Sequence, residues 1–343
     1  MRKIGCLGGT FDPVHIGHIE CAKKVLKTFG LDEIWLLPAK DAPLKNQTST
    51  SFEMRTKMCK IACKPYRKLK VCTIENELPI PSYTINTVKE LKKKYPHDKF
   101  YWIVGDDQVA QFNAWKDIDQ LLSEVQFIAV NRNGLVIDDN RLLVMSDIKR
   151  LESSTRVRQG HFRDCCKGVR NYILNNELYL EEIVKNHCSE KRANHVFSMT
   201  KVCVELAKIH HVNMHEARMA GLLHDICKEM DKTEELKIMN IYFKDKLHLS
   251  NVIYHSYTAI PWIKENLGYT NKKVLSAIYN HTICNSNSKL SKILFISDKV
   301  DPSRGYDSSN LIEVSKRNLN EGYKLVLSER NEYLVKEGKQ IDK

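Results

Sequence analysis

The stretch KIGCLGGTFDPVHIGH, from Lys3 to His18, decides the fold of the first half of this chain. It begins with a short apolar run that is typical of a buried strand, and it continues into Ile16–Phe29, which has the period of a helix. Between the two, Gly8 and Gly9 allow a tight turn and a close approach of the backbone to a ligand. The stretch therefore predicts a strand, a glycine turn and a helix, in that order.

The same stretch also predicts a phosphate site. A helix that begins near His15 points unpaired N–H groups at whatever lies above the end of the strand. His15 and His18 are three residues apart and share one helix face, with Gly17 leaving room between them. Imidazoles in this place donate hydrogen bonds to phosphate oxygens and stabilise charge that develops in a transition state. Far downstream, SSTRVR (153–158) offers hydroxyls and two cations ahead of a helical stretch, which favours a second anion contact.

Beyond this stretch, strand and helix patterns alternate through the first half. Strand-like runs are DEIWLLPA (32–39), LKVCTI (69–74), KFYWIVGDD (99–107) and VQFIAVNR (125–132), and helical patterns lie at Met54–Ala62, at Ile85–Lys94 and around Leu121–Leu122. This alternation predicts a Rossmann-like α/β domain, with a parallel sheet of right-handed units and helices on both faces. Such sheets bind ligands at the carboxyl ends of their strands, near the point where the strand order reverses.

The second half has a different pattern. From about Lys167 the strand signals disappear, and six segments have helical patterns: VRNYILNNELYLEEIV, HVFSMTKVCVELAKIHH, MHEARMAGLLHDICKEM, VIYHSYTAIPWIKENLG, KKVLSAIYNHTI and KLSKILFISDKV. We therefore expect an α/β domain over residues 1–180 and an all-α domain over residues 181–343. No low-complexity tract or Gly/Ser linker separates the two.

Composition limits the class of protein. The chain has 343 residues, 42% of them hydrophobic and 28% charged, and this length is typical of two domains. No apolar run is long enough for a membrane helix, and the apolar stretch near Met1 is too short for the signal peptide of an exported protein, so none is expected. Eleven cysteines without a C-x-x-C pair indicate free thiols, so a reducing cytoplasm is expected. The formal net charge of +12 favours polyanionic partners, among which charge alone does not choose.

The pattern G-G-T-F-D-P-x-H-x-G-H after a first strand, with S-S-T-x-x-R near the end of the domain, resembles the bacterial nicotinate mononucleotide adenylyltransferases. The similarity extends through GLDEIWLLPA, PLK, PSYTINTV, IVGDDQ, AWK and VNRNG, over roughly residues 1–180. H-x-G-H alone would indicate only the wider nucleotidyltransferase superfamily. SYT, together with a tryptophan shortly after GDD, narrows the resemblance to the nicotinate branch.

The resemblance implies that nicotinate mononucleotide attacks the α-phosphate of ATP, which releases pyrophosphate and forms deamido-NAD with Mg²⁺ on the phosphates. It assigns His15, His18 and Arg158 to catalysis. The ATP-binding residues that it implies are Gly8, Gly9, Thr10, Phe11, His15, His18, Lys45, Arg132, Ser154, Thr155 and Arg158. Trp115 would stack on the nicotinate ring, Thr84 and Gly105 would contact the acceptor, and Asp107 would bind a ribose hydroxyl. Trp115 is equally a candidate core residue. The family commonly has a histidine before the lysine of PLK, where this chain has Leu44.

Histidines and aspartates recur through the helical half in the order H, HD, H, H, D. They lie in NHVF, LLHDICK, IYHSY, YNHT and FISDKVDPSR. This order resembles the HD-domain phosphohydrolases over roughly residues 185–335. HDICK, NHT and SDKVDPSR are most similar to the bacterial branch that hydrolyses diadenosine tetraphosphate symmetrically to two ADP, a bis(5'-nucleosyl)-tetraphosphatase activity.

That resemblance implies a metal centre with Asp225 as a catalytic and bridging group. His195, His224, Asp225 and Asp298 would hold one metal, and His255 and His281 would complete a second metal or contact phosphate. Mixed imidazole and carboxylate ligands suit one or two iron ions, or manganese. The residues implied in contact with ADP or polyphosphate are Arg192, His255, His281, Thr282 and Arg304, with Lys228 in a nearby electrostatic role.

Three alternatives remain open at this point. In one alternative, the first half adenylylates another acceptor, such as phosphopantetheine, although SYT and Trp115 argue against this acceptor. The second half would hydrolyse another nucleotide, such as a cyclic dinucleotide or a deoxynucleotide triphosphate, or would only sense nucleotides. Nucleic-acid binding explains the charge but neither histidine pattern. We therefore expect small nucleotides as partners, no membrane and no nucleic acid, and leave a homo-oligomer open.

Overall fold

The chain divides into two compact units, Met1–Asn176 and Glu177–Lys343. The computed structural model describes residues 1–41, 50–131, 137, 139–145, 152–283 and 285–338. The unit boundary lies four residues before the expected one at residue 180, at the end of a helix that the sequence pattern extends further. None of the described helices is both long and apolar enough to cross a membrane. Cysteines in the described part of the chain are free thiols.

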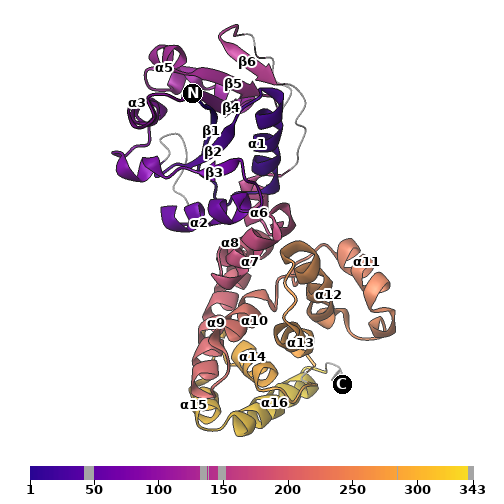
Figure 1. Ribbon diagram of the computed structural model, residues 1–343. Helices are drawn as coiled ribbons and strands as arrows, with labels where there is room; N and C mark the ends of the chain where they lie inside the picture. The colour runs from indigo at the N-terminus through magenta and orange to yellow at the C-terminus, as the bar shows by residue number, and fades with distance from the viewer. Residues whose placement is uncertain (42–49, 132–136, 138, 146–151, 284, 339–343) are drawn as a thin grey trace. The chain divides into compact units, whose positions relative to one another are not determined.

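The first unit is built on a six-stranded sheet in the order β3-β2-β1-β4-β5-β6 (Figure 1). The strands are β1 Lys3–Gly9, β2 Glu33–Pro38, β3 Leu69–Val71, β4 Lys99–Gly105, β5 Gln126–Val130 and β6 Leu142–Met145. Every neighbouring pair is parallel, which confirms the predicted α/β sheet. Strand β6 was not predicted, because Leu143 and Val144 are exposed at the edge of the sheet and leave no buried run to recognise.

Helices cover both faces of this sheet. On one face, α3 (Thr84–Lys94) and α5 (Ile118–Glu124) pack with apolar side chains of β1, β4 and β5 into one core cluster. On the opposite side lies α1, Ile16–Thr28 (Figure 1). Helix α2, Phe52–Cys63, packs against β2 and β3. Shorter helices follow at α4 Asp106–Val109, α6 Ser154–Arg158 and α7 Lys167–Asn175.

The strand order reverses at β1, which has β2 on one side and β4 on the other. Gly9 pairs with Pro38 of β2, and Leu7 pairs with Ile103 of β4. The carboxyl ends of β1 and β4 therefore adjoin at the reversal, where open parallel sheets form a crevice. The glycine turn of the sequence lies directly at this point.

The described residues of the second unit form helices and turns without a strand (Figure 1). Its helices are α8 Leu180–His187, α9 Glu190–Ile209, α10 Met214–Leu223, α11 Lys232–Tyr242, α12 Tyr254–Trp262, α13 Lys272–Asn280, α14 Lys289–Lys299, α15 Ser309–Arg317 and α16 Leu319–Lys336. Gly221 lets α10 approach α9 closely, because a Cβ there would lie 2.6 Å from Oγ1 of Thr200. This contact brings together two helices that carry the histidine pattern.

Two helical patterns end earlier than the sequence predicts. VRNYILNNELYLEEIV forms α7 and α8, because Glu177 and Tyr179 between them adopt left-handed backbone angles with φ of 55° and 65°. MHEARMAGLLHDICKEM forms a helix only as far as Leu223, and turns follow it. The HD pair therefore lies in a turn and not within a helix.

Candidate functional sites

The glycine turn at the end of β1 is tightly packed. A Cβ at Gly8 would lie 3.2 Å from the Trp102 ring, and one at Gly9 would lie 3.3 Å from the Phe11 ring. Phe11 itself has a φ of 50°, in the left-handed region. A side chain at either position would therefore require the neighbouring ring to shift by a few tenths of an ångström.

His15 and His18 lie together at the start of α1, as the sequence predicts. His15 is the residue before the first helical position, and its N–H donates to Nδ1 of His18 over 3.2 Å. This bond leaves Nε2 of His18 to carry the ring proton of a neutral imidazole. The two ring centroids are 3.7 Å apart. A Cβ on Gly17 would lie 2.9 Å from Nδ1 of His15, so glycine is needed between the histidines.

Residues from the far end of the unit join this turn through α6. The hydroxyl of Ser154 donates to the carbonyl oxygen of Pro13 over 2.9 Å, and Nη1 of Arg158 donates to that of Asp12 over 2.7 Å. Thr155 lies on the same short helix. The structure thus brings Ser154 and Arg158 to the glycine turn across more than one hundred residues of sequence.

The residues predicted to bind the acceptor come from the end of β4 and from segments that follow β3 and β4 along the chain. Gly105 ends β4, Asp107 is exposed in α4, and Thr84 begins α3. Trp115 is half-buried, with its ring 5.3 Å from that of Phe112 and packed against the core. Its position agrees with a core role and leaves part of the indole accessible.

Three residues of the sequence prediction lie outside the described residues: Leu44, Lys45 and Arg132.

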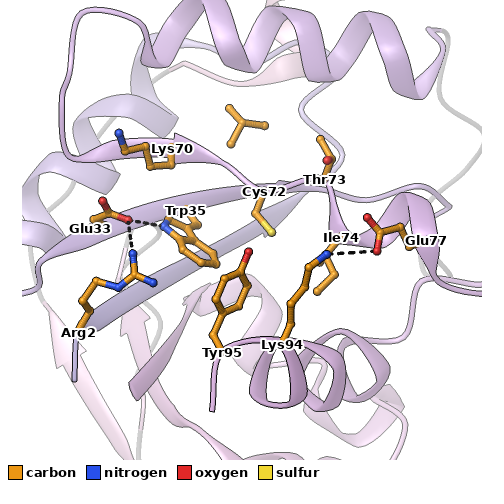
Figure 2. A pocket seen from close by; sticks show the side chains of 11 residues that line it. Arg2, Glu33, Trp35, Lys70, Cys72, Thr73, Ile74, Glu77, Lys94 and Tyr95 are labelled. Atoms are coloured by element: carbon orange, nitrogen blue, oxygen red, sulfur yellow. Dashed lines mark hydrogen bonds and ion pairs between the residues drawn. The ribbon is translucent and has the colours of Figure 1, made fainter. Parts of the chain in front are cut away.

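A hollow of about 400 Å³ lies elsewhere in the first unit (Figure 2). Trp35 and Tyr95 face it, and Lys70 of the edge strand β3 lies beside them. Its charged groups include Arg2, which pairs with Glu33 and Asp98, and Lys94, which pairs with Glu77. Because these cations are already neutralised and the hollow includes none of the predicted site residues, we assign it no role.

In the second unit, six predicted side chains converge in a buried cluster. His195 comes from α9, His255 from α12 and Asp298 from α14, while His224–Asp225 and His281 follow α10 and α13. All six residues are at least nine-tenths buried. Nitrogen and oxygen atoms from distant parts of the sequence therefore face one another in the interior.

Asp225 lies at the centre of the cluster. Its Oδ1 atom is 3.2 Å from Nε2 of His255, 3.6 Å from Nε2 of His224 and 3.7 Å from Nε2 of His281. Asp298 lies beside it, with Oδ1 3.1 Å from Nε2 of His195 and 4.0 Å from Nε2 of His224. His224 thus faces both carboxylates.

Backbone contacts orient two of the imidazoles. Nδ1 of His224 donates to the carbonyl oxygen of Gly221 over 2.8 Å, and Nδ1 of His281 donates to that of Ile278 over 2.6 Å. In both rings the proton then resides on Nδ1, and the lone pair of Nε2 points into the cluster. Nε2 of His224 is buried without a hydrogen-bond partner. An unsatisfied buried nitrogen of this kind is costly unless it binds a ligand.

This donor set fits a metal ion. Two groups of three residues each bring their ligand atoms within 4.8 Å of one another. One group is His195, His224 and Asp298, and the other is His224, Asp225 and His281. Burial lowers the pKa of His224 and of His255 to about 4, so both imidazoles are neutral at neutral pH. Neutral imidazole and ionised carboxylate are the forms that bind metals.

Cations surround the two carboxylates. Nη1 of Arg192 lies 2.8 Å from Oδ2 of Asp225, while Lys299 and Arg304 contact Asp298 at 2.6 and 2.7 Å. Burial alone would raise the pKa of Asp298, but Lys299, His195, His224 and Arg304 together hold it well below its usual range. The pKa of Asp225 is likewise held well below its usual range, so both carboxyl groups are ionised and each has a cation beside it.

The remaining predicted contacts lie at the border of the cluster. Lys228 donates to Nδ1 of His255 over 3.2 Å, and burial lowers the pKa of its amine. Oγ1 of Thr282 lies 3.1 Å from Oγ of Ser256. Lys299 and Asp301 were not predicted as site residues, although both lie in SDKVDPSR, because only their contacts in the folded protein distinguish them from other charged residues.

Comparison with known proteins agrees with this division. A cytidylyltransferase-like family model matches residues 6–160, and an HD domain model matches residues 192–303. A probable nicotinate-nucleotide adenylyltransferase/Ap4A hydrolase of Mycoplasma pneumoniae is 27% identical over 335 residues, which cover 93% of this chain and 96% of the relative. A probable nicotinate-nucleotide adenylyltransferase of Bacillus licheniformis is 39% identical over 187 residues, covering 52% and 99%.

The nicotinate-nucleotide adenylyltransferase of Bacillus subtilis is 37% identical over 185 residues, covering 53% of this chain and 97% of the relative. All three relatives match over nearly their whole length. The two Bacillus relatives cover about half of this chain, whereas the Mycoplasma relative covers both units. The chain therefore belongs to the nicotinate-nucleotide adenylyltransferase family and contains an HD domain in its second unit.

Proposed function

We propose that this chain is a bifunctional enzyme of adenine nucleotides. Its first unit transfers the adenylyl group of ATP to nicotinate mononucleotide, giving deamido-NAD and pyrophosphate. Its second unit hydrolyses diadenosine tetraphosphate symmetrically to two ADP in a metal-dependent reaction. The observation that carries the proposal is the presence of two separate histidine sites in one chain, one beside a glycine turn and one in a buried carboxylate cluster. The combined name of the Mycoplasma relative supports the pairing of activities.

In the first unit the reaction needs positioning and neutralisation of the leaving pyrophosphate. His15 and His18 would donate hydrogen bonds to phosphate oxygens from the start of α1, with Ser154, Thr155 and Arg158 approaching from α6. A phosphate of the acceptor would attack the α-phosphate in line, so no covalent enzyme intermediate is needed. Mg²⁺ would enter with the ATP phosphates.

The acceptor would lie toward the carboxyl end of β4. Trp115 would stack on the nicotinate ring, Thr84 and Gly105 would contact the acceptor, and Asp107 would bind a ribose hydroxyl. Half-burial of Trp115 supports this role, because the indole is fixed by Phe112 while one part stays accessible. A rigid aromatic surface binds a planar ring at low entropic cost.

In the second unit, His195, His224, Asp225 and Asp298 would hold a metal ion, and His255 and His281 would complete a second site or contact phosphate. Iron or manganese suits this mixed ligand set. Such an ion polarises phosphoryl oxygens and lowers the pKa of bound water. Arg192 and Arg304 would bind the polyphosphate, and Lys228 would orient His255 through its 3.2 Å contact with Nδ1.

Product analysis on variants of the full chain tests the proposal. His224→Ala should still make deamido-NAD from ATP and nicotinate mononucleotide but should no longer make ADP from diadenosine tetraphosphate. His18→Ala should show the reverse pattern. The matched controls are His248→Ala and His97→Ala, because these histidines are exposed in the second and first unit.

Each negative outcome points to a different error. If the intact chain contains metal but leaves diadenosine tetraphosphate unchanged, the HD domain acts on another nucleotide or only senses one. If ATP is consumed only with another acceptor, such as phosphopantetheine, the nicotinate assignment is wrong. Loss of both activities in His224→Ala would contradict two independent sites.

A further inference from the structure

Arg55 of α2 is a fully buried cation, only 1% exposed, and it hydrogen-bonds to backbone carbonyl oxygens. Its Nη1 atom donates to Thr10 over 2.6 Å and to Ala39 over 2.8 Å. Nε donates to Thr50 over 3.3 Å, and Nη2 lies 3.5 Å from the oxygen of Lys40. One side chain therefore connects three separate segments of the first unit.

These segments adjoin the candidate ATP site. Thr10 belongs to the glycine turn after β1, and Ala39 follows β2. The two are also joined directly, because the N–H of Ala39 donates to the carbonyl oxygen of Gly9 over 2.8 Å. On the other side, the hydroxyl of Thr50 donates to the carboxylate of Asp12. Arg55 is thus part of one network with the turn that precedes His15.

The direction of these bonds matters for the turn. In a planar trans peptide the C=O and the N–H point in opposite directions. Because the carbonyl of Thr10 is held toward Arg55, the N–H of Phe11 in the same peptide unit points away from α2. The guanidinium therefore constrains the direction of one backbone donor of the turn, the N–H of Phe11.

We propose that Arg55 is a positioning residue of the adenylyl-transfer site. It holds the turn after β1 and the segment after β2 in one arrangement, so that the ATP-binding surface is formed before ATP arrives. This inference rests on the proposed function of the first unit and adds to it a residue whose side chain hydrogen-bonds to backbone carbonyl oxygens beside the candidate ATP site. Preorganised donors stabilise developing charge without reorganisation cost, and small misplacements of them are expensive in rate.

Arginine is the side chain that suits this position. Its planar guanidinium carries five N–H donors in a fixed fork, which is how it bonds to carbonyls of three segments at once. Lysine keeps the charge but has a single ammonium group, which cannot reach the same set of oxygens. Burying a cation is expensive, and an apolar side chain would serve better if α2 needed only packing. The conservative change Arg55→Lys therefore separates fork geometry from charge.

The experiment compares the full chain with Arg55→Lys and with Met58→Ala. Met58 is fully buried in the same helix and has no hydrogen-bond donor in its side chain, so its truncation is a control for lost stability without lost hydrogen bonds to the turn. Three quantities are measured: hydrogen exchange of peptides that contain Thr10–Val14 and Ala39, the dissociation constant of an ATP analogue that cannot be cleaved between the α- and β-phosphates, and kcat and KM for both substrates. Metal content of the second unit serves as an internal control.

We expect Arg55→Lys to exchange faster at both segments and to bind the ATP analogue about tenfold more weakly, with kcat/KM lowered by about 100-fold. Met58→Ala should unfold at a lower temperature but keep analogue affinity and local exchange close to wild type. Metal content should be the same in all three proteins. If Arg55 only stabilised the fold, both variants would change analogue affinity and local exchange to a similar extent. A difference between them in these two quantities therefore supports a positioning role.

Two outcomes overturn the inference. One is wild-type exchange and wild-type ATP affinity in Arg55→Lys, and the other is an equal loss of affinity in Met58→Ala. Failure of the proposed function gives a different result. If the wild-type chain binds the ATP analogue but forms no deamido-NAD, the proposed adenylyl transfer is wrong, and the exchange and affinity data still test the role of Arg55.

Discussion

Oδ2 of Asp301 lies 2.7 Å from Nδ1 of His195, while Nε2 of the same ring lies 3.1 Å from Oδ1 of Asp298. Asp301 is fully buried and also accepts a hydrogen bond from the backbone N–H of Ser303. A carboxylate on one nitrogen of a histidine fixes the ring orientation and makes the other nitrogen a stronger metal ligand. Asp301 therefore supports the candidate metal centre from outside the predicted ligand set.

We expect Asp301→Asn to bind metal about 10- to 100-fold more weakly. A neutral amide oxygen accepts a weaker hydrogen bond from Nδ1–H of His195 than an ionised carboxylate does. The measurement is competition with a chelator of known affinity, followed by metal analysis of the protein. Asp245→Asn, an exposed aspartate of the same unit, is the control for the lost charge. Wild-type metal retention in Asp301→Asn would contradict this role.

Arg304 contacts Asp298 through two of its nitrogens, and its side chain is 38% exposed. One part of the guanidinium is thus anchored at the cluster while another can meet an anionic substrate. We expect Arg304→Gln to raise the KM for diadenosine tetraphosphate about tenfold, the effect of losing one charge-assisted contact. Steady-state kinetics and metal analysis on the same sample measure this, with exposed Arg317→Gln as the control. Lost metal with an unchanged KM would assign Arg304 to the ligand carboxylate instead.

Trp115 offers a direct test of its two roles. Its ring packs edge-on against Phe112 and Phe127, and it is only half-buried. If it stacks on the acceptor, Trp115→Ala should raise the KM for nicotinate mononucleotide at least about tenfold, the value of a lost aromatic stack, and leave the KM for ATP unchanged. Trp115→Phe should retain most of the affinity. A purely core role predicts lower stability in Trp115→Ala with both KM values unchanged.

Local sequence patterns predicted those strands and helices whose burial and periodicity can be recognised over a few residues. The strand–glycine–helix order around Gly8–Gly9 was confirmed, because strand burial and helix period are readable over a few residues. The short edge strand β6 was missed, since its side chains are largely exposed. Helix α10 ends at Leu223 because His224 bonds back to Gly221, a contact that no periodicity reveals.

Spacing identified His15 and His18, and residue chemistry identified the 153–158 stretch, whereas the other candidate site residues came from a family pattern. No sequence pattern pairs Asp301 with His195, because the two residues are over one hundred positions apart. Arg55 looked like any other cation of a lysine-rich chain, and only its burial among carbonyl oxygens distinguishes it. Contacts that depend on tertiary structure are the ones that sequence reasoning could not supply.

Glu75 gives the first unit a pH dependence. It is 5% exposed in the short helix Ile74–Glu77, where it accepts hydrogen bonds from Oγ1 of Thr87 at 3.0 Å and from the N–H of Lys40 at 3.3 Å. Burial raises the pKa of its carboxyl above the ordinary 4.5, and these hydrogen bonds only partly oppose the shift. The folded protein therefore holds this proton to higher pH than the unfolded chain does.

Stability must then fall as the pH rises from 4.5 through the folded-state pKa, because the unfolded chain releases its proton first. Glu75→Gln has no such proton, so its free energy of unfolding, relative to wild type, should increase between pH 4.5 and neutral pH. Urea unfolding followed by tryptophan fluorescence measures this in the full chain, since three of its four tryptophans, Trp35, Trp102 and Trp115, lie in the first unit. Exposed Glu77→Gln controls for the lost charge. A difference between Glu75→Gln and wild type that stays constant over this range would mean that Glu75 has the same pKa folded and unfolded.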